Sequence, residues 1–171
     1  LKFLGEQGAY KNVKKACAIA APLDLKSGSL HLNTPKNYLY QRRFMRSLKK
    51  KACAKHAQYP ELFDLKKLES IHTIYDFDDL ITAPIHGFEH AEDYYKKCSA
   101  KNFLENIQIP TQILNAMNDP FLTPIILNKS ITAHADHVSY KITSEGGHCG
   151  YPNFIAKTYW SEVFAVNYFK S

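Results

Sequence analysis

The chain has 171 residues, of which 45% are hydrophobic, and its 22 Lys and Arg against 16 Asp and Glu give a formal net charge of +6. This length and composition predict one soluble globular domain. Because no apolar run reaches the roughly 18 residues that a bilayer requires, a membrane-spanning helix is excluded. The positive charge leaves nucleic acid and anionic lipid open as partners.

Four widely spaced cysteines form no C-x-x-C pair: Cys17, Cys53, Cys98 and Cys149. This spacing predicts reduced thiols in a cytoplasmic protein, and with the eight His residues it gives no ligand pattern for zinc. No secretory leader is visible. Residues 1–8 resemble the end of a helix that lacks a cap at its start, so we expect the natural chain to begin further upstream.

A strand is predicted over residues 13–21, because residues 16–21 are an unbroken apolar run that ends at Pro22. Continuous apolar runs are typical of parallel strands that are buried on both faces. Thr34 and Pro35 then predict the start of a helix, and Leu62, Leu65 and Leu68 predict another short one.

The helix after Pro35 is amphipathic and strongly basic. Its functional interpretation is an electropositive face that attracts anionic lipid or a carboxylate-bearing substrate, so peripheral contact with a membrane is one hypothesis. The alternative is a solvated face whose long Lys and Arg stems cover a core. No nucleic-acid-binding module is recognisable, so we predict no nucleic-acid partner. The cations are Arg42, Arg43, Arg46, Lys49, Lys50, Lys51 and Lys55.

Residues 70–100 predict two helices, at about 74–83 and 89–98, which Pro84 and Gly87 separate. Three acids lie near the start of the first helix: Asp76, Asp78 and Asp79. One interpretation is that they carry out acid–base chemistry or bind a cation. The other is that they are ordinary acids of a helix's first turn, which face the positive end of the helix dipole.

His86 and His90 have the i, i+4 spacing of metal ligands, but the breakers between them argue against a shared helix. We therefore predict no metal site.

A regular α/β pattern follows. A strand at residues 111–116 ends in a turn that carries Asp119, and Pro124 predicts a helix that runs to about Ala135. A second strand begins at Val138 and delivers His148 directly after two glycines. A final amphipathic helix is expected over residues 154–169.

Asp119 and His148 thus follow consecutive strands that one crossover connects. A right-handed crossover places such strands near each other, with both turns on one edge of the sheet. A buried carboxylate that bonds one imidazole nitrogen leaves the other nitrogen to act as a base for a nucleophile.

The nucleophile elbow G-x-S-x-G that would complete this arrangement is absent from the sequence. Ser29 lacks the flanking glycines, the strand before it and a helix directly after it. Cys149 directly follows His148, and the side chains of adjacent residues point away from each other. We therefore expect neither Ser29 nor Cys149 to be the nucleophile.

Several motifs agree in order and spacing with one family. They are F-D-D-L-I-T-A-P-I-H-G-F from residue 77, D-Y-Y-K-K-C-S from residue 93, I-L-N-A-M-N-D-P-F from residue 113 and E-G-G-H-C-G-Y from residue 145. Together with Y-L-Y-Q-R-R-F in the basic helix, they resemble the YheT-like esterase family of α/β-hydrolases over essentially the whole chain. The family includes bacterial proteins and related eukaryotic lipid esterases and acyltransferases.

The resemblance implies the C-terminal portion of an α/β-hydrolase fold, with about three parallel strands, flanking helices and a helical cap at residues 33–106. It implies that Asp119 is the triad acid and His148 the triad base, and that the Ser nucleophile lies about two turns before residue 1. It also implies that no cofactor is needed. Without the preceding strand, the strand at residues 13–21 is expected to present an open edge that favours poor solubility or pairing with another chain.

The sequence therefore predicts part of a serine ester hydrolase that acts on small-molecule acyl esters and is inactive by itself. Three alternatives stay open: a non-catalytic fragment or a subunit that pairs with another chain, a basic membrane-surface module, and acyl transfer to an alcohol by the complete enzyme. The oligomeric state does not follow from the sequence.

Overall fold

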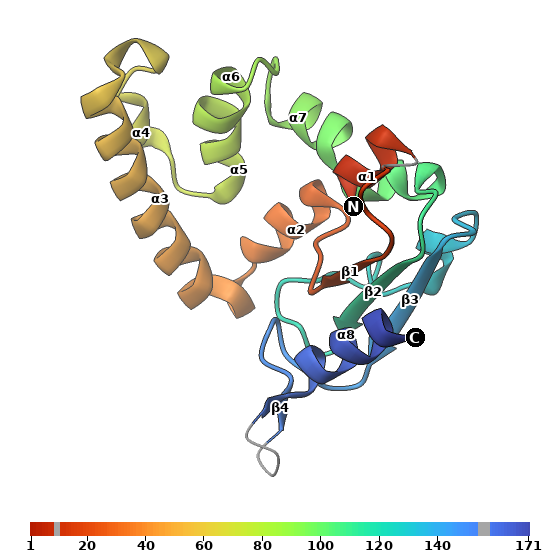
Figure 1. Cartoon of the computed structure of the whole chain (residues 1–171). Coiled ribbons are helices and arrows are strands. Elements are labelled where there is room, and N and C mark those ends of the chain that lie inside the picture. Colours follow the sequence, from red (N-terminus) through yellow and green to blue (C-terminus); the bar gives the residue numbers. More distant parts are fainter. Residues whose placement is uncertain (9–10, 154–157) are drawn as a thin grey trace. The chain divides into compact units, whose positions relative to one another are not determined.

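The computed structural model describes residues 1–8, 11–153 and 158–171 of the chain (Figure 1). These residues form two compact units. The sheet unit comprises Leu1–Asp24 and Ser99–Ser171, and the helical unit comprises Leu25–Cys98. No helix among the described residues is both long enough and apolar enough to cross a membrane.

The sheet unit is built on three parallel strands in the order β1-β2-β3 (Figure 1). The strands are β1 (Ala16–Ile19), β2 (Thr111–Ala116) and β3 (Val138–Thr143). The central strand β2 is almost wholly buried, as expected for a strand that pairs on both sides and is covered on both faces. The three predicted parallel strands are therefore confirmed.

Strand β1 is shorter than the predicted 13–21. Its pairing starts where Ala16 lies opposite Thr111, the first residue of β2, and stops at Ile19. The next residue, Ala20, has a φ of 54°, which turns the backbone out of the extended region. The Ala20 N–H still donates to the Leu114 carbonyl of β2 at 2.8 Å, and Ala20 is buried, so the apolar run continues one residue beyond the strand.

Helices α1 (Lys2–Gln7) and α8 (Trp160–Lys170) and the 3-10 segment η4 (Ala100–Asn106) flank the sheet. Helix α8 contributes Trp160 and Phe164 to a cluster with Ile19 and Leu114, whereas α1 packs against η4. A short hairpin, β4 (Pro152–Asn153) and β5 (Thr158–Tyr159), precedes α8. The main core of the unit comprises Leu4, Leu23, Leu104, Ile107, Ile109, Ile113, Leu122, Ile126, Ala135 and Val138.

Two helix predictions in this unit need correction. The helix expected from Pro124 to Ala135 is wrong: turns replace it, with only a 3-10 segment, η5 (Lys129–Thr132). Asn128 is extended and its side chain accepts a hydrogen bond from the Ser130 N–H, so it ends one turn and caps the next. The final helix begins at Trp160, and residues 154–157 of the prediction lie outside the described residues.

The helical unit contains α2 (Leu25–Leu32), η1 (Pro35–Asn37), α3 (Tyr38–Gln58), η2 (Pro60–Leu62), α4 (Lys67–Ser70), α5 (Ile74–Phe77), η3 (Asp78–Thr82), α6 (Ala83–Ile85) and α7 (Ala91–Cys98) (Figure 1). Its core is a separate apolar cluster that the long helix α3 enters with Met45 and Ala52. The other members are Phe63, Leu68, Ile71, Phe77 and Ile81.

Pro84 does not end the helix that begins at Ile74. The segment η3 is a π-turn in which the Ala83 N–H bonds the Asp78 carbonyl, and α6 continues from it through Pro84. A π-turn rearranges the local hydrogen bonds, so the missing proline N–H is accommodated. The helix instead ends at Ile85, two residues before Gly87, whose φ is 76°.

The helical unit begins at residue 25 and ends at residue 98, whereas the predicted cap insertion spans 33–106. Helix α2 lies against α5 and α7 of its own unit, while η4 packs on α1 of the sheet unit. Because α2 packs within the helical unit and η4 packs within the sheet unit, the unit spans residues 25–98 instead of the predicted 33–106.

Candidate active site

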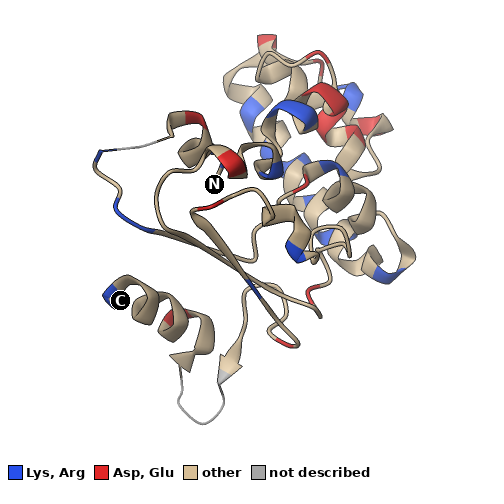
Figure 2. Cartoon of the chain, turned by 90° about the vertical axis from the view of Figure 1, so that its right-hand side faces the viewer, with Lys and Arg blue, Asp and Glu red and all other residues tan. Residues whose placement is uncertain are grey.

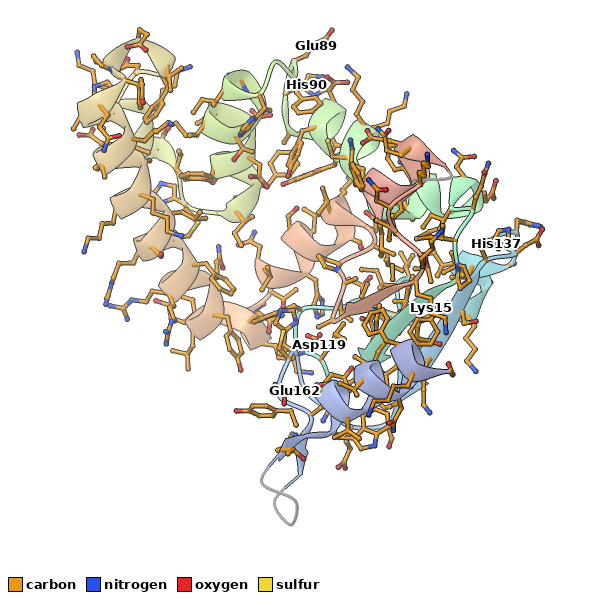
Figure 3. The ribbon with its side chains drawn as sticks, in the orientation of Figure 1. Lys15, Glu89, His90, Asp119, His137 and Glu162 are labelled. Carbon is orange, nitrogen blue, oxygen red and sulfur yellow. The ribbon has the colours of Figure 1, made fainter. Side chains whose placement is uncertain are left out.

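Asp119 and His148 lie at the carboxyl edge of the three-stranded sheet. Asp119 is in the turn after β2, and His148 is in the loop after β3, which pairs in parallel with β2 from Thr111 opposite Val138 to Ala116 opposite Thr143. In Figure 3, Asp119 lies at one end of the sheet and His137, which directly precedes β3, lies at the other. The structure thus brings the two predicted residues to the same edge.

The two side chains are in direct contact. His148 Nδ1 is 2.9 Å from Asp119 Oδ2, and the Asp119 side chain has no exposed surface, while 38% of the His148 side chain is exposed. Asp119 Oδ1 accepts a hydrogen bond of 2.9 Å from the Phe121 N–H. The Phe121 ring lies edge-on to the His148 imidazole, with 4.6 Å between the two ring centroids. The carboxylate is therefore fixed, and the imidazole Nε2 is the nitrogen left for chemistry.

A second contact joins the same two loops. The Asn118 Oδ1 accepts a hydrogen bond of 2.8 Å from the Gly147 N–H. Asn118 precedes Asp119, and Gly147 precedes His148, so two adjacent bonds hold the loops in register. Asn118 is not among the site residues predicted from the sequence, although its position beside Asp119 in a turn was a signal that could have identified it.

Tyr151 shapes the loop from the other side. Its N–H donates to the Gly146 carbonyl at 2.7 Å, and its buried ring occupies the space that a Gly146 side chain would need: an ideal Cβ there would lie 2.4 Å from the ring. Gly147 has a φ of 63°, which favours glycine. Burial raises the pKa of the Tyr151 phenol to about 12, so Tyr151 is uncharged at neutral pH.

A cleft of about 620 Å³ opens beside this loop. It is large enough for a small organic group, and its lining combines an aromatic wall with the polar groups of the two strand ends. The lining residues are Asn118, Thr143, Glu145, Gly146, Gly147, Tyr151, Pro152 and Trp160.

The three acids of the helical unit do not form a reactive cluster. Asp76 completes a capping box with Thr73, and Asp79 accepts the Ala91 N–H at 2.8 Å. Asp78 accepts the Tyr95 hydroxyl at 2.7 Å, and burial raises the pKa of Asp78. Each carboxylate therefore has a structural partner.

His86 and His90 do not share a helix, because α6 ends before His86 and α7 begins after His90. His90 Nδ1 accepts the Asp93 N–H at 3.2 Å, and Figure 3 labels His90 beside Glu89 in the loop before α7. Within residues 1–8, 11–153 and 158–171, no group of three or more His, Cys, Asp or Glu residues is placed to hold a metal ion.

Neither of the two rejected nucleophiles lies in an elbow. Ser29 lies inside α2, where its hydroxyl donates to the Lys26 carbonyl at 3.0 Å, and Cys149 is an exposed free thiol next to His148. Neither residue therefore lies on the strand-to-helix turn of a nucleophile elbow.

Comparison with known proteins identifies the family. The chain is 38% identical over 150 residues to the candidate esterase YheT of Escherichia coli, an alignment that covers 86% of this chain and 44% of that protein. This chain belongs to the YheT-like esterase family of α/β-hydrolases. No family model and no solved structure matches it.

Two further relatives support the assignment. The chain is 32% identical over 139 residues to the candidate esterase slr0264 of Synechocystis, covering 80% of this chain and 38% of the relative. It is 27% identical over 156 residues to a monoacylglycerol lipase of Saccharomyces cerevisiae, an alignment that covers 87% of this chain and 34% of the relative. The chain thus spans less than half the length of each of these three relatives, and its sheet and flanking helices are part of an α/β-hydrolase fold.

Proposed function

We propose that the whole protein containing this chain is a serine carboxylic-ester hydrolase in which His148 is the general base and Asp119 orients it. The observation that carries the proposal is the 2.9 Å contact between the imidazole and a carboxylate with no exposed surface. A buried carboxylate selects the tautomer with its proton on Nδ1 and stabilises the imidazolium that forms during the reaction.

In this mechanism a Ser hydroxyl outside these 171 residues attacks the ester carbonyl while His148 Nε2 takes its proton. The imidazolium then gives that proton to the departing alkoxide, which leaves as the alcohol, and the acyl group stays on Ser. Water attacks the acyl-enzyme with His148 again as base and releases the carboxylic acid. The chain carries no G-x-S-x-G motif, so we expect it to be inactive alone.

The proposed substrates are acyl esters of the lipid type. This rests on relatives named as a monoacylglycerol lipase and a phospholipase, and on the cleft beside the His148 loop. We propose that the helical insertion selects the acyl chain. Transfer of the acyl group to an alcohol uses the same acyl-enzyme, and one relative is named as an ester synthase and esterase, so an alcohol acceptor is the second candidate.

The deciding experiment measures hydrolysis of p-nitrophenyl esters by the whole protein and by two histidine variants. His148→Ala is expected to lower kcat by at least roughly 10³-fold, because the base is lost. The matched control is His137→Ala, an exposed residue at the opposite end of β3, which should keep full activity. Equal activity of the His148 variant and the wild type would refute the proposal.

The same assay on the 171-residue chain separates the rivals. Ester hydrolysis that disappears on His148→Ala would show that the chain has a nucleophile of its own. Inactivity of both the chain and the whole protein would favour a non-catalytic fragment or a subunit that pairs with another chain. We also propose a cytoplasmic location, since none of the four cysteines, all of which the structure describes, forms a disulfide.

A further inference from the structure

The outward face of α3 is a concentrated cationic surface. The helix carries seven Lys and Arg residues and no Asp or Glu between Tyr38 and Gln58. Its inward face is fixed by Met45 and Ala52, which are 7% and 4% exposed in the core of the helical unit. Figure 2 shows blue Lys and Arg segments recurring along the helices of this unit.

At the start of the helix, three arginines lie beside an exposed leucine. Arg42, Arg43 and Arg46 follow Leu39 at i+3, i+4 and i+7, which places all four on one helix face. Leu39 is 76% exposed, and the four residues line a shallow hollow of about 430 Å³. None of these arginines forms an ion pair with another described residue, so their charge is available to a partner.

A second hollow of about 270 Å³ adjoins the first and shares Arg42 and Arg46 with it. Lys49, His72 and Tyr38 also line this hollow, and Tyr38 is 57% exposed, whereas the lining residues Met45 and Ile71 are only 7% and 0% exposed. Cationic groups beside the exposed side chains of Leu39 and Tyr38 match a ligand that is anionic at one end and hydrocarbon at the other. A phospholipid has that chemistry.

We propose that this α3 face, defined by Tyr38, Leu39, Arg42, Arg43, Arg46 and Lys49, docks on the surface of an anionic phospholipid bilayer. The arginines bind headgroup phosphates, for which the guanidinium fork is well suited, and Leu39 and Tyr38 enter the boundary between headgroups and acyl chains. An exposed aliphatic side chain beside the cations favours a bilayer over nucleic acid or an acidic peptide, which offer it no hydrocarbon to enter. The proposal does not rest on the esterase activity, because binding is measured without turnover.

The expected strength follows from the charge count. Each Lys or Arg near an anionic membrane contributes about a fivefold factor in the partition coefficient, so loss of three arginines should weaken binding by roughly 100-fold. Screening should weaken it further, since the Debye length falls from about 30 Å at 0.01 M salt to about 8 Å at 0.15 M.

The test is co-sedimentation of the whole protein with vesicles of equimolar phosphatidylglycerol and phosphatidylcholine, and with vesicles of phosphatidylcholine alone. The wild type should bind the anionic vesicles at low salt and release them at high salt. The variant Arg42→Gln/Arg43→Gln/Arg46→Gln should bind roughly 100-fold more weakly. Because Gln is a good helix former at exposed positions, the variant should fold, and circular dichroism checks this.

The matched control Lys66→Gln/Lys67→Gln/Lys129→Gln removes the same charge at exposed positions outside α3 and should bind like the wild type within a few-fold. Leu39→Ser should weaken binding to anionic vesicles while leaving the salt dependence unchanged. Equal weakening by the control would overturn the proposal in favour of a net-charge effect. If the protein bound polyglutamate or DNA as strongly as anionic vesicles, and Leu39→Ser did not weaken that binding, the proposal would be overturned in favour of a general polyanion-binding surface.

Discussion

The acids of the two units have different partners. In the helical unit, Asp76 and Asp79 accept backbone N–H groups within 12 positions of themselves, and each closes a cap or a turn. In the sheet unit, Asp119 meets His148 across 29 positions, and only the parallel pairing of β2 with β3 brings them together. A carboxylate whose bonds are satisfied locally holds a helix, whereas Asp119 holds an imidazole that comes from a neighbouring strand end, as our proposed mechanism requires.

The two units also differ in the exposure of their charged groups. The pair proposed to be catalytic in the sheet unit has a carboxylate without exposed surface, whereas 38% of the His148 side chain is exposed. The α3 face of the helical unit keeps its arginines on the surface, where long-range attraction is useful and no precise geometry is needed.

The largest effect that tests this contrast is expected from Asp119→Asn in the whole protein. An amide cannot hold His148 in the required tautomer, so kcat should fall by roughly 10⁴-fold with little change in KM. Steady-state ester hydrolysis measures this. The control Asp136→Asn makes the same chemical change in the exposed residue just before β3 and should leave kcat unaltered. A loss below about tenfold for Asp119→Asn would argue against its role.

Two glycine substitutions give the next contrast. Gly146→Ala should destabilise the protein by about 1–3 kcal/mol, because the new Cβ would clash with the Tyr151 ring. Gly28→Ala, in α2, should stabilise it by about 0.5–1 kcal/mol, because no atom lies within 4 Å of the new Cβ and alanine favours a helix. Urea unfolding measures both. An unchanged or increased stability of Gly146→Ala would mean that the loop after β3 is not sterically fixed.

Asn118→Ala should have a smaller effect, on the order of a tenfold decrease in kcat with KM unchanged, because the Gly147 N–H loses its acceptor and the His148 loop loosens. The control Asn128→Ala removes a comparable bond, to the Ser130 N–H, away from the two loops and should keep kcat. A lower kcat at unchanged KM and unchanged Tm distinguishes loss of positioning from loss of folding. An unchanged kcat would remove Asn118 from the site.

The smallest effect is expected from Asp78→Asn. Burial raises the folded-state pKa of Asp78 although its hydrogen bonds with Tyr95 and Thr82 oppose the shift, so the ionised form is disfavoured in the fold. A raised carboxyl pKa contributes stability that is complete below the unfolded pKa and lost as pH rises through the folded value. The variant should therefore have a slightly higher Tm than the wild type at neutral pH, and the gap should close in acid. A lower Tm at neutral pH would show that the bond to Tyr95 outweighs the buried charge.

The sequence predicted the sheet better than the helices. The apolar run before Pro22 and the alternation after Val138 indicated strands that are present, because burial and side-chain alternation are local properties of a strand. The helix predictions at Pro84 and Pro124 were wrong. The helix continues through Pro84 after the π-turn η3. No helix runs from Pro124 to Ala135, and Asn128 instead caps the new turn η5. Both outcomes depend on bonds to groups that local propensity does not weigh.

The sequence by itself determined which residues follow the strands, and therefore that Asp119 and His148 were candidates for one edge of the sheet. Only the tertiary structure decided the 2.9 Å contact between them, the bond from Gly147 to Asn118 and the ring that holds Gly146. The reason is physical: residue order and hydrophobic period fix an element along the chain, whereas strand register and side-chain packing between distant segments fix where its polar ends meet.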